Sequence, residues 1–167
     1  MRTFLLIFLP WLALLLQTTI LDYLSISGVV PDLVLIFVVF FALLNKVYPG
    51  TIYGFCCGLL EDLYLGRFIG INAISKGLTA FIIGKLQGNV FKDNLFVGIM
   101  SVFIATLLNS AFVFILSIAS YDFFHFDISL LIGLIIQVLF NTTIALPLYV
   151  WYHGFSRKEL SESFGEL

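Results

Sequence analysis

Long apolar runs separated by short polar stretches form the pattern of this 167-residue chain. Each run is continuously apolar, unlike the alternating strands of a membrane β-barrel. A helix needs about 20 apolar residues to cross a bilayer. The pattern therefore predicts an all-α integral membrane protein with six transmembrane helices in a single domain over residues 1–167. The predicted spans are 4–21, 30–44, 48–65, 69–86, 96–120 and 128–152, with a short polar tail at 156–167.

The composition agrees with solvation by lipid. Hydrophobic residues make up 61% of the chain and charged residues 11%, whereas about a quarter of an average soluble domain is charged. The formal net charge is -2, and no basic cluster with interleaved aromatic residues indicates a nucleic-acid surface. We therefore expect membrane lipid, and no nucleic acid, around this chain.

The positions of the basic residues predict the orientation of the spans, because cytoplasmic loops carry an excess of Lys and Arg. Six of them fall on one side if both termini are cytoplasmic: Arg2, Lys46, Lys85, Lys92, Arg157 and Lys158. The opposite side carries only Arg67, and Lys76 lies inside a span. An odd number of spans would spoil this segregation. The N- and C-termini are therefore both predicted to be cytoplasmic.

Glycines recur along the third span at Gly50, Gly54 and Gly58, with Gly66 just after its end. A spacing of four residues places small side chains on one helical face, where another helix backbone can approach closely. Packing inside the bundle is the simpler interpretation of this stripe. A groove for a partner helix is the alternative.

Three charges inside or near the ends of spans are candidates for function. Glu61 and Asp62 lie about one turn from the outer end of the third span, and Lys76 lies within the fourth. Such charges are costly in lipid unless they are paired or hydrated. A tight turn around 66–68 makes the two helices antiparallel neighbours, so we hypothesise an ion pair between Lys76 and one of the two acids. The pair could be a structural staple or part of a functional site.

The last two spans carry amides at mid-depth. Asn109 lies in the fifth span, and Gln137 and Asn141 share a face of the sixth. Amides in lipid usually form hydrogen bonds between helices, so joining the fifth helix to the sixth is the simpler interpretation. Lining a small polar cavity is the alternative. Pro147 is expected to bend the inner end of the sixth helix.

Catalysis and metal binding find little support in the sequence. His125 and His153 lie at the predicted interfaces, with no second ligand at metal spacing. No phosphate-binding loop with its lysine is present, nor is a G-x-S-x-G nucleophile elbow. Glu61 and Asp62 are adjacent, so on a helix their carboxylates diverge. The chain is not expected to be an enzyme or to need a cofactor or metal.

Three motifs together resemble the rod shape-determining protein MreD family. They are Pro31-Asp32 followed by the apolar segment 33–36, the glycine-rich segment 54–66 that ends in Leu-Leu-Glu-Asp-Leu-x-x-Gly, and the segment 70–76. Proline suits the first position of a helix, and an acid beside it complements the helix dipole. The resemblance covers essentially the whole chain.

The resemblance implies a multi-pass protein of the bacterial inner membrane and a component of the cell-elongation machinery, the elongasome. The implied partner is a bitopic MreC-like protein, and through it MreB-like filaments and peptidoglycan synthases. The implied fold is similar to the S components of energy-coupling-factor transporters. Five residues match the family pattern and are expected to shape an outer surface or groove that receives a partner: Pro31, Asp32, Gly58, Asp62 and Gly66. The function expected from all this is a non-enzymatic membrane scaffold that binds the transmembrane helix of its partner.

Two other classes stay open. One is a substrate-binding S-type subunit of a small-molecule (vitamin) transporter, with an outward pocket. Its lining would come from Asp32, Glu61, Asp62, Asn109, Gln137 and Asn141. Aromatic and polar groups around a cavity of roughly several hundred Å³ would favour this class, and a filled interior would favour the scaffold. The other is a lipid or isoprenoid-carrier binding protein with a groove open to lipid.

Overall fold

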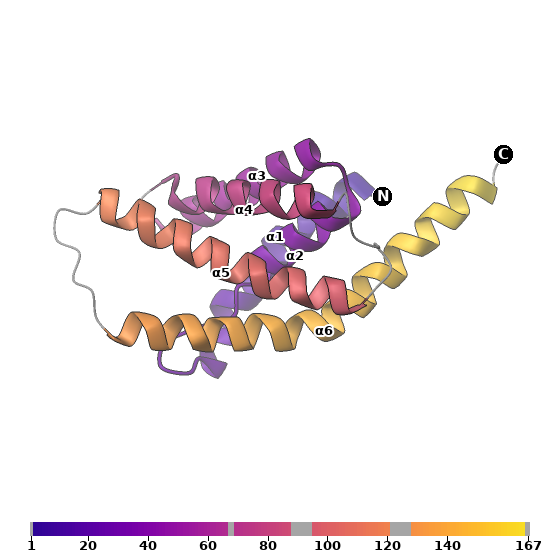
Figure 1. The fold of residues 1–167 in the computed structure, drawn as a ribbon. Helices are drawn as coiled ribbons and strands as arrows, with labels where there is room; N and C mark the ends of the chain where they lie inside the picture. The colour runs from indigo at the N-terminus through magenta and orange to yellow at the C-terminus, as the bar shows by residue number, and fades with distance from the viewer. Residues whose placement is uncertain (1, 67–68, 88–94, 121–127, 166–167) are drawn as a thin grey trace.

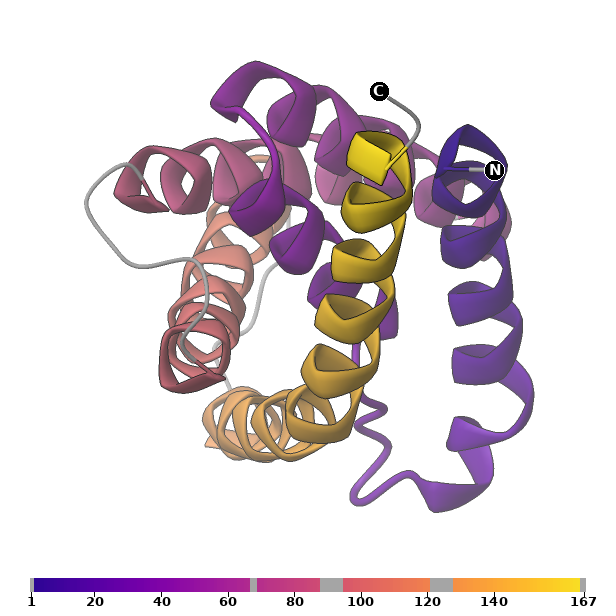
Figure 2. The same ribbon diagram turned by 90° about the vertical axis from the view of Figure 1, so that its right-hand side faces the viewer.

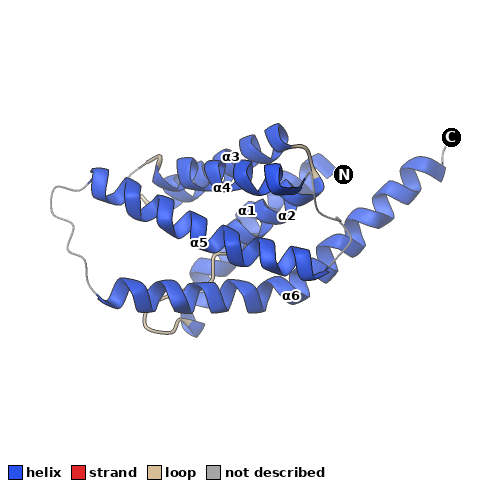
Figure 3. Ribbon diagram, in the orientation of Figure 1, coloured by secondary structure: helices blue, strands red, loops and turns tan. Residues whose placement is uncertain are grey.

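A computed structural model describes residues 2–66, 69–87, 95–120 and 128–165. Within these ranges the chain is helical and forms no β-strand, as predicted (Figures 1 and 3). The helices are α1 (Arg2–Thr19), α2 (Leu33–Leu44), α3 (Val47–Leu65), α4 (Ile71–Gln87), α5 (Leu95–Ser120) and α6 (Ile128–Gly165), with a 3₁₀ turn η1 at Leu21–Leu24.

The predicted helices agree with these elements except at two ends. α2 begins at Leu33, three residues later than predicted, because Asp32 caps it. α6 continues to Gly165, so residues 156–165 extend the last helix and are not a separate tail. By length and composition, two helices in the described part qualify as membrane spans, Leu95–Ala119 and Ile128–Val150.

α2 is the central helix of the bundle. It contacts each of the other five helices, and every residue from Leu33 to Leu43 is buried. Figures 1 and 2 show it enclosed by its neighbours. Its 12 residues extend about 18 Å at 1.5 Å per residue, and the hydrocarbon core of a bilayer is about 30 Å thick. α2 therefore covers only part of that thickness and begins inside the bundle.

α3 and α4 form the closest helix pair of the fold. A Cβ added to Gly58 would lie 2.2 Å from the backbone oxygen of Asn72, and one added to Gly54 would lie 2.8 Å from that of Lys76. The stripe therefore packs inside the bundle, where no side chain larger than hydrogen fits at Gly58. Gly66 is not part of it: this residue ends α3 with a φ of 61°, a left-handed conformation that favours glycine. Of the turn predicted at 66–68, residues 67 and 68 lie outside the described ranges.

α5 and α6 lie side by side near the start of α5 and diverge toward its end (Figures 1 and 2). α6 contains Pro147 and changes direction along its length, in the segment where its colour passes from orange to yellow (Figure 2). Proline removes one helical hydrogen bond and favours such a bend. The outward faces of the two helices are apolar, with Ile115, Ile135 and Leu139 among their exposed residues. This exterior suits lipid.

Candidate functional site

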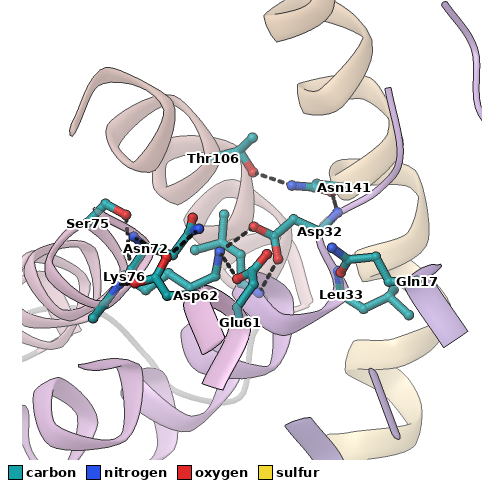
Figure 4. Close-up of polar contacts among 12 residues, drawn as sticks. Gln17, Asp32, Leu33, Glu61, Asp62, Asn72, Ser75, Lys76, Thr106 and Asn141 are labelled. Atoms are coloured by element: carbon teal, nitrogen blue, oxygen red, sulfur yellow. Dashed lines mark hydrogen bonds and ion pairs between the residues drawn. The ribbon is translucent and has the colours of Figure 1, made fainter. Parts of the chain in front are cut away.

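The centre of the site is an ion-paired lysine inside the bundle. The side chain of Lys76, on α4, is fully buried, and its Nζ lies 2.6 Å from Asp32 Oδ2 and 2.8 Å from Glu61 Oε2. The three residues come from α4, the cap of α2 and α3 (Figure 4). The hypothesised ion pair with one of the two adjacent acids is therefore present, and its acid is Glu61. Asp32 is a second partner that the sequence hypothesis did not include.

Asp62 has a different role. Its carboxylate accepts hydrogen bonds from the backbone N–H groups of Gly70, Asn72 and Ala73 and from the side-chain amide of Asn72, over 2.8 to 3.1 Å. These donors lie at the beginning of α4, where unpaired N–H groups and the helix dipole favour a negative charge. Adjacent residues on α3 thus point to different partners: Glu61 to the lysine and Asp62 to the start of the next helix.

The beginning of α2 needs partners because it is buried among apolar residues. Asp32 Oδ1 accepts from the backbone N–H of Leu35 at 2.8 Å. The backbone N–H of Asp32 donates to Asn141 Oδ1 at 2.8 Å, and that of Leu33 to Gln17 Oε1 at 3.2 Å. Backbone groups without water must be satisfied within the protein. Side chains from α1 and α6 thus complete the cap of α2.

Asn141 extends the polar cluster to α5. Its Nδ2 donates to Thr106 Oγ1 at 3.1 Å, and Thr106 in turn donates to the backbone oxygen of Val102 at 2.9 Å. The amide therefore joins α6 to both α5 and α2 (Figure 4). We define the polar cluster as Asp32, Glu61, Lys76, Thr106 and Asn141. It links α2, α3, α4, α5 and α6 in one connected set of ion pairs and hydrogen bonds.

The other predicted polar residues do not join this cluster. Asn109 is buried, and in the described part of the chain its Oδ1 has no hydrogen-bond partner. Gln137 is half-buried and lines a pocket between α5 and α6. Pro31 is buried directly before the cap of α2. The hydrogen bond from α6 to α5 thus runs from Asn141 to Thr106 and does not involve Asn109.

The sequence interpretation missed three residues: Thr106, which belongs to the cluster, and Gln17 and Asn72, which bond to residues beside it. Gln17 is a polar residue in an otherwise apolar stretch of the first span, which was the available signal. Thr106 is one of several hydroxyl residues in the apolar spans, and hydroxyls can satisfy themselves by bonding to the carbonyl four residues earlier. Sequence alone does not distinguish the hydroxyl residues that also accept a hydrogen bond from another helix.

Two of the larger cavities in the described part of the chain lie outside the polar cluster. An apolar groove of about 450 Å³ runs between α1 and α6 over α2. Its lining is Leu9, Leu12, Ala13, Leu16, Ile20, Leu21, Leu33, Phe37, Ile144 and Leu148. A second pocket, of about 570 Å³, lies between α5, α6 and the segment 27–30 and has hydroxyl and amide groups in its walls.

The chemistry of the polar cluster is that of charges neutralising one another. The described residues include no group of three His, Cys, Asp or Glu side chains arranged to hold a metal ion. Lys76 is held between two carboxylates, and Asp62 is saturated by four donors. Removing the Lys76 charge leaves two buried carboxylates without a counter-charge, which is strongly destabilising. This arrangement fixes the relative positions of five helices.

The fold and the site together define an all-helical membrane protein with an apolar exterior and an internally paired polar cluster. The chain belongs to the MreD family: the family model described as rod shape-determining protein MreD matches residues 1–159. The resemblance inferred from the sequence is thereby confirmed, and with it a membrane protein of rod-shape morphogenesis. The family works in general with the MreB and MreC shape complex. No curated protein and no solved structure matches the chain significantly. The implied likeness to S components stays a prediction.

Proposed function

We propose that this chain is a non-enzymatic scaffold of the bacterial elongation complex, with six membrane spans and both termini in the cytoplasm. In this proposal it binds the single transmembrane helix of an MreC-like partner, and through it MreB-like filaments and peptidoglycan synthases. The supporting observation is the polar cluster, whose charges are used to hold the protein's own helices together. A rigid bundle with an apolar exterior suits a subunit that presents a fixed surface within the membrane.

The groove between α1 and α6 is the docking face we propose. The glycine stripe is already filled by α4 and α2, since Gly54 and Gly58 meet α4 and Gly50 meets Ala42. The groove is apolar throughout, and α2 forms its floor with Leu33 and Phe37. Because lipid chains are as apolar as leucine, helices associate in membranes through close packing. A groove offers more packing area to a partner helix than a convex face does.

A co-purification experiment tests this proposal. The tagged chain would be extracted from its native host in mild detergent and its partners identified by mass spectrometry. Leu12→Trp fills the groove, and Ile115→Trp places the same side chain on a lipid-facing site of α5 that is 59% exposed. We expect the native chain and Ile115→Trp to recover a single-span MreC-like protein and Leu12→Trp to recover much less. Equal recovery by both variants would reject the groove as the docking face.

The transporter alternative keeps one supporting observation, the pocket between α5 and α6. Its walls combine Phe114 with Gln137 and several serines. The acids expected to line a substrate pocket are used elsewhere: Asp32 and Glu61 belong to the polar cluster, and Asp62 caps the start of α4. The same purification separates the two classes. Recovery of paired ATPases with a coupling membrane subunit, in place of an MreC-like protein, would favour the transporter subunit and reject the scaffold.

A further inference from the structure

The pocket between α5 and α6 is built from two facing stripes. On α5, Ser110 and Ser117 lie seven residues apart, two turns along one face; on α6, Ser129, Gly133 and Gln137 recur at four-residue spacing. Residues this far apart share a helical face. The two helices diverge at this end of the bundle (Figure 1), and the segment 27–30 closes one side of the pocket. The pocket of about 570 Å³ falls within the usual range for small ligands, about 300 to 1,000 Å³.

The walls of the pocket are polar but uncharged. None of its lining residues is an Asp, Glu, Lys, Arg or His within the described part of the chain. Serine hydroxyls and the glutamine amide each donate and accept hydrogen bonds, so they match ligand groups that do both. A charged ligand would lose its hydration without gaining an opposite charge. Val113, Phe114 and Leu134 add apolar surface that suits the C–H face of a ring.

Gln137 points to a ligand more strongly than the serines do. Its neighbour one turn further along the same face, Asn141, bonds to two other helices. Among the described residues, by contrast, no hydrogen bond is made by the Gln137 side chain, although it is half-buried. A serine can bond to its own helix, whereas the Gln137 amide lines the pocket with its donors and acceptor unused among the described residues.

We propose that this pocket binds a neutral, hydroxyl-rich group of about one or two sugar rings, with Gln137 as its main hydrogen-bonding residue. The group can belong to a free saccharide or to the headgroup of a glycolipid, since both present the same hydroxyls. This binding site is separate from the groove between α1 and α6, so the inference holds whether or not the docking proposal does.

Binding is tested on the full chain in nanodiscs of phosphatidylethanolamine and phosphatidylglycerol. The free probe is N,N′-diacetylchitobiose, followed by calorimetry, and the lipid probe is monoglucosyl diacylglycerol built into the nanodisc, followed by native mass spectrometry. We expect saturable binding of at least one probe. Binding of the disaccharide would identify the ligand as a free saccharide, and binding of the glycolipid alone would identify it as a lipid headgroup. Glucose 6-phosphate should bind at least about tenfold more weakly than the disaccharide, because the described lining of the pocket has no cation to receive its charge.

Three variants test whether the probe binds in this pocket or elsewhere on the protein. Gln137→Leu should lower the affinity for the probe about tenfold, because one or two hydrogen bonds are lost. Gly133→Leu should abolish binding, because its side chain fills the pocket next to Val29. Leu139→Ile, on the exposed face of α6, should bind as the native chain does. All three should elute as a monodisperse peak on gel filtration, as the native chain does, which shows that they fold. They should also recover the MreC-like partner at native levels.

The proposal is overturned if neither probe binds saturably at concentrations up to about 10 mM, the range of very weak ligands. It is also overturned if Gln137→Leu and Gly133→Leu bind like the native chain, or if glucose 6-phosphate binds as tightly as the disaccharide. Loss of the partner with intact probe binding would instead contradict only the docking proposal.

Discussion

Replacing Lys76 with methionine tests whether the polar cluster holds the bundle together. Methionine keeps most of the length and apolar volume of lysine but removes the charge. In Lys76→Met, Asp32 and Glu61 would remain buried and would lose the ammonium group that lies 2.6 and 2.8 Å away. The two carboxylates would then face one another inside the bundle with no positive charge between them.

The size of the effect follows from these distances. Unit charges about 2.7 Å apart attract by about 6 kcal/mol at an effective dielectric constant of about 20. Much of this attraction offsets the cost of removing three charges from water, and breaking a buried pair costs about 3–5 kcal/mol overall. For a chain of this size, 1 kcal/mol lowers the melting temperature by about 2–4 °C. We therefore expect Lys76→Met to melt about 6–20 °C below the native protein.

The assay is thermal unfolding in detergent, read as the monodisperse fraction by gel filtration after heating. Lys85→Met is the matched control, because Lys85 is an exposed lysine on the same helix, 4.9 Å above the ring of Phe81. An exposed contact of this kind contributes about 0.5–1 kcal/mol. Adding Glu61→Gln to Lys76→Met should recover part of the loss, because one uncompensated carboxylate is then gone. The reasoning is refuted if Lys76→Met and Lys85→Met melt within about 2 °C of each other.

Substitutions at four further residues probe the same framework, each measured by thermal unfolding. Gly58→Ala should be far more destabilising than Gly50→Ala. The new Cβ at Gly58 would lie 2.2 Å from a backbone oxygen, whereas the new Cβ at Gly50 would lie 3.1 Å from its nearest atom. Equal losses of stability in the two variants would contradict this packing. Asp62→Ala should cost about 2–5 kcal/mol, since four donors lose their acceptor, and Asp62→Asn should cost less because one oxygen remains. Asn141→Leu should cost about 1–3 kcal/mol, because it leaves the buried N–H of Asp32 without an acceptor and removes the donor to Thr106; a neutral result would show that this N–H finds another acceptor.

The helices were predictable because their signal is local. Continuous apolar runs of the right length place six helices, and the observed ends differ from the predicted ones mainly where a side chain decides the boundary. Asp32 delays α2 by capping it, and a cap is a geometric feature that apolar periodicity does not report. The extension of α6 to Gly165 was missed because its last residues are polar and lack the apolar run on which the prediction relied.

The polar cluster was only partly predictable, for a physical reason. Lys76 and Glu61 lie on helices joined by a short turn, so their proximity follows from the order of the chain. Asp32 and Asn141 are 109 residues apart in the sequence, and no local rule brings them together. Asn109 and Asn141 are both mid-span amides, yet only Asn141 connects helices. Which of two such residues does so depends on how α5 and α6 are rotated about their axes, and a single sequence does not give that rotation.

The buried start of α2 has a consequence for the synthesis of this protein. The beginning of this short helix is complete only when Asn141 Oδ1 on α6 accepts the hydrogen bond from the backbone N–H of Asp32. Ribosomes add about 5–20 residues per second, so the later residue follows the earlier one by about 5–20 s. During that interval the backbone N–H of Asp32 lacks the acceptor that α6 supplies. The nascent chain therefore needs a protected or hydrated environment at its insertion site until the last helix arrives, and truncations before α6 should be cleared by membrane proteases.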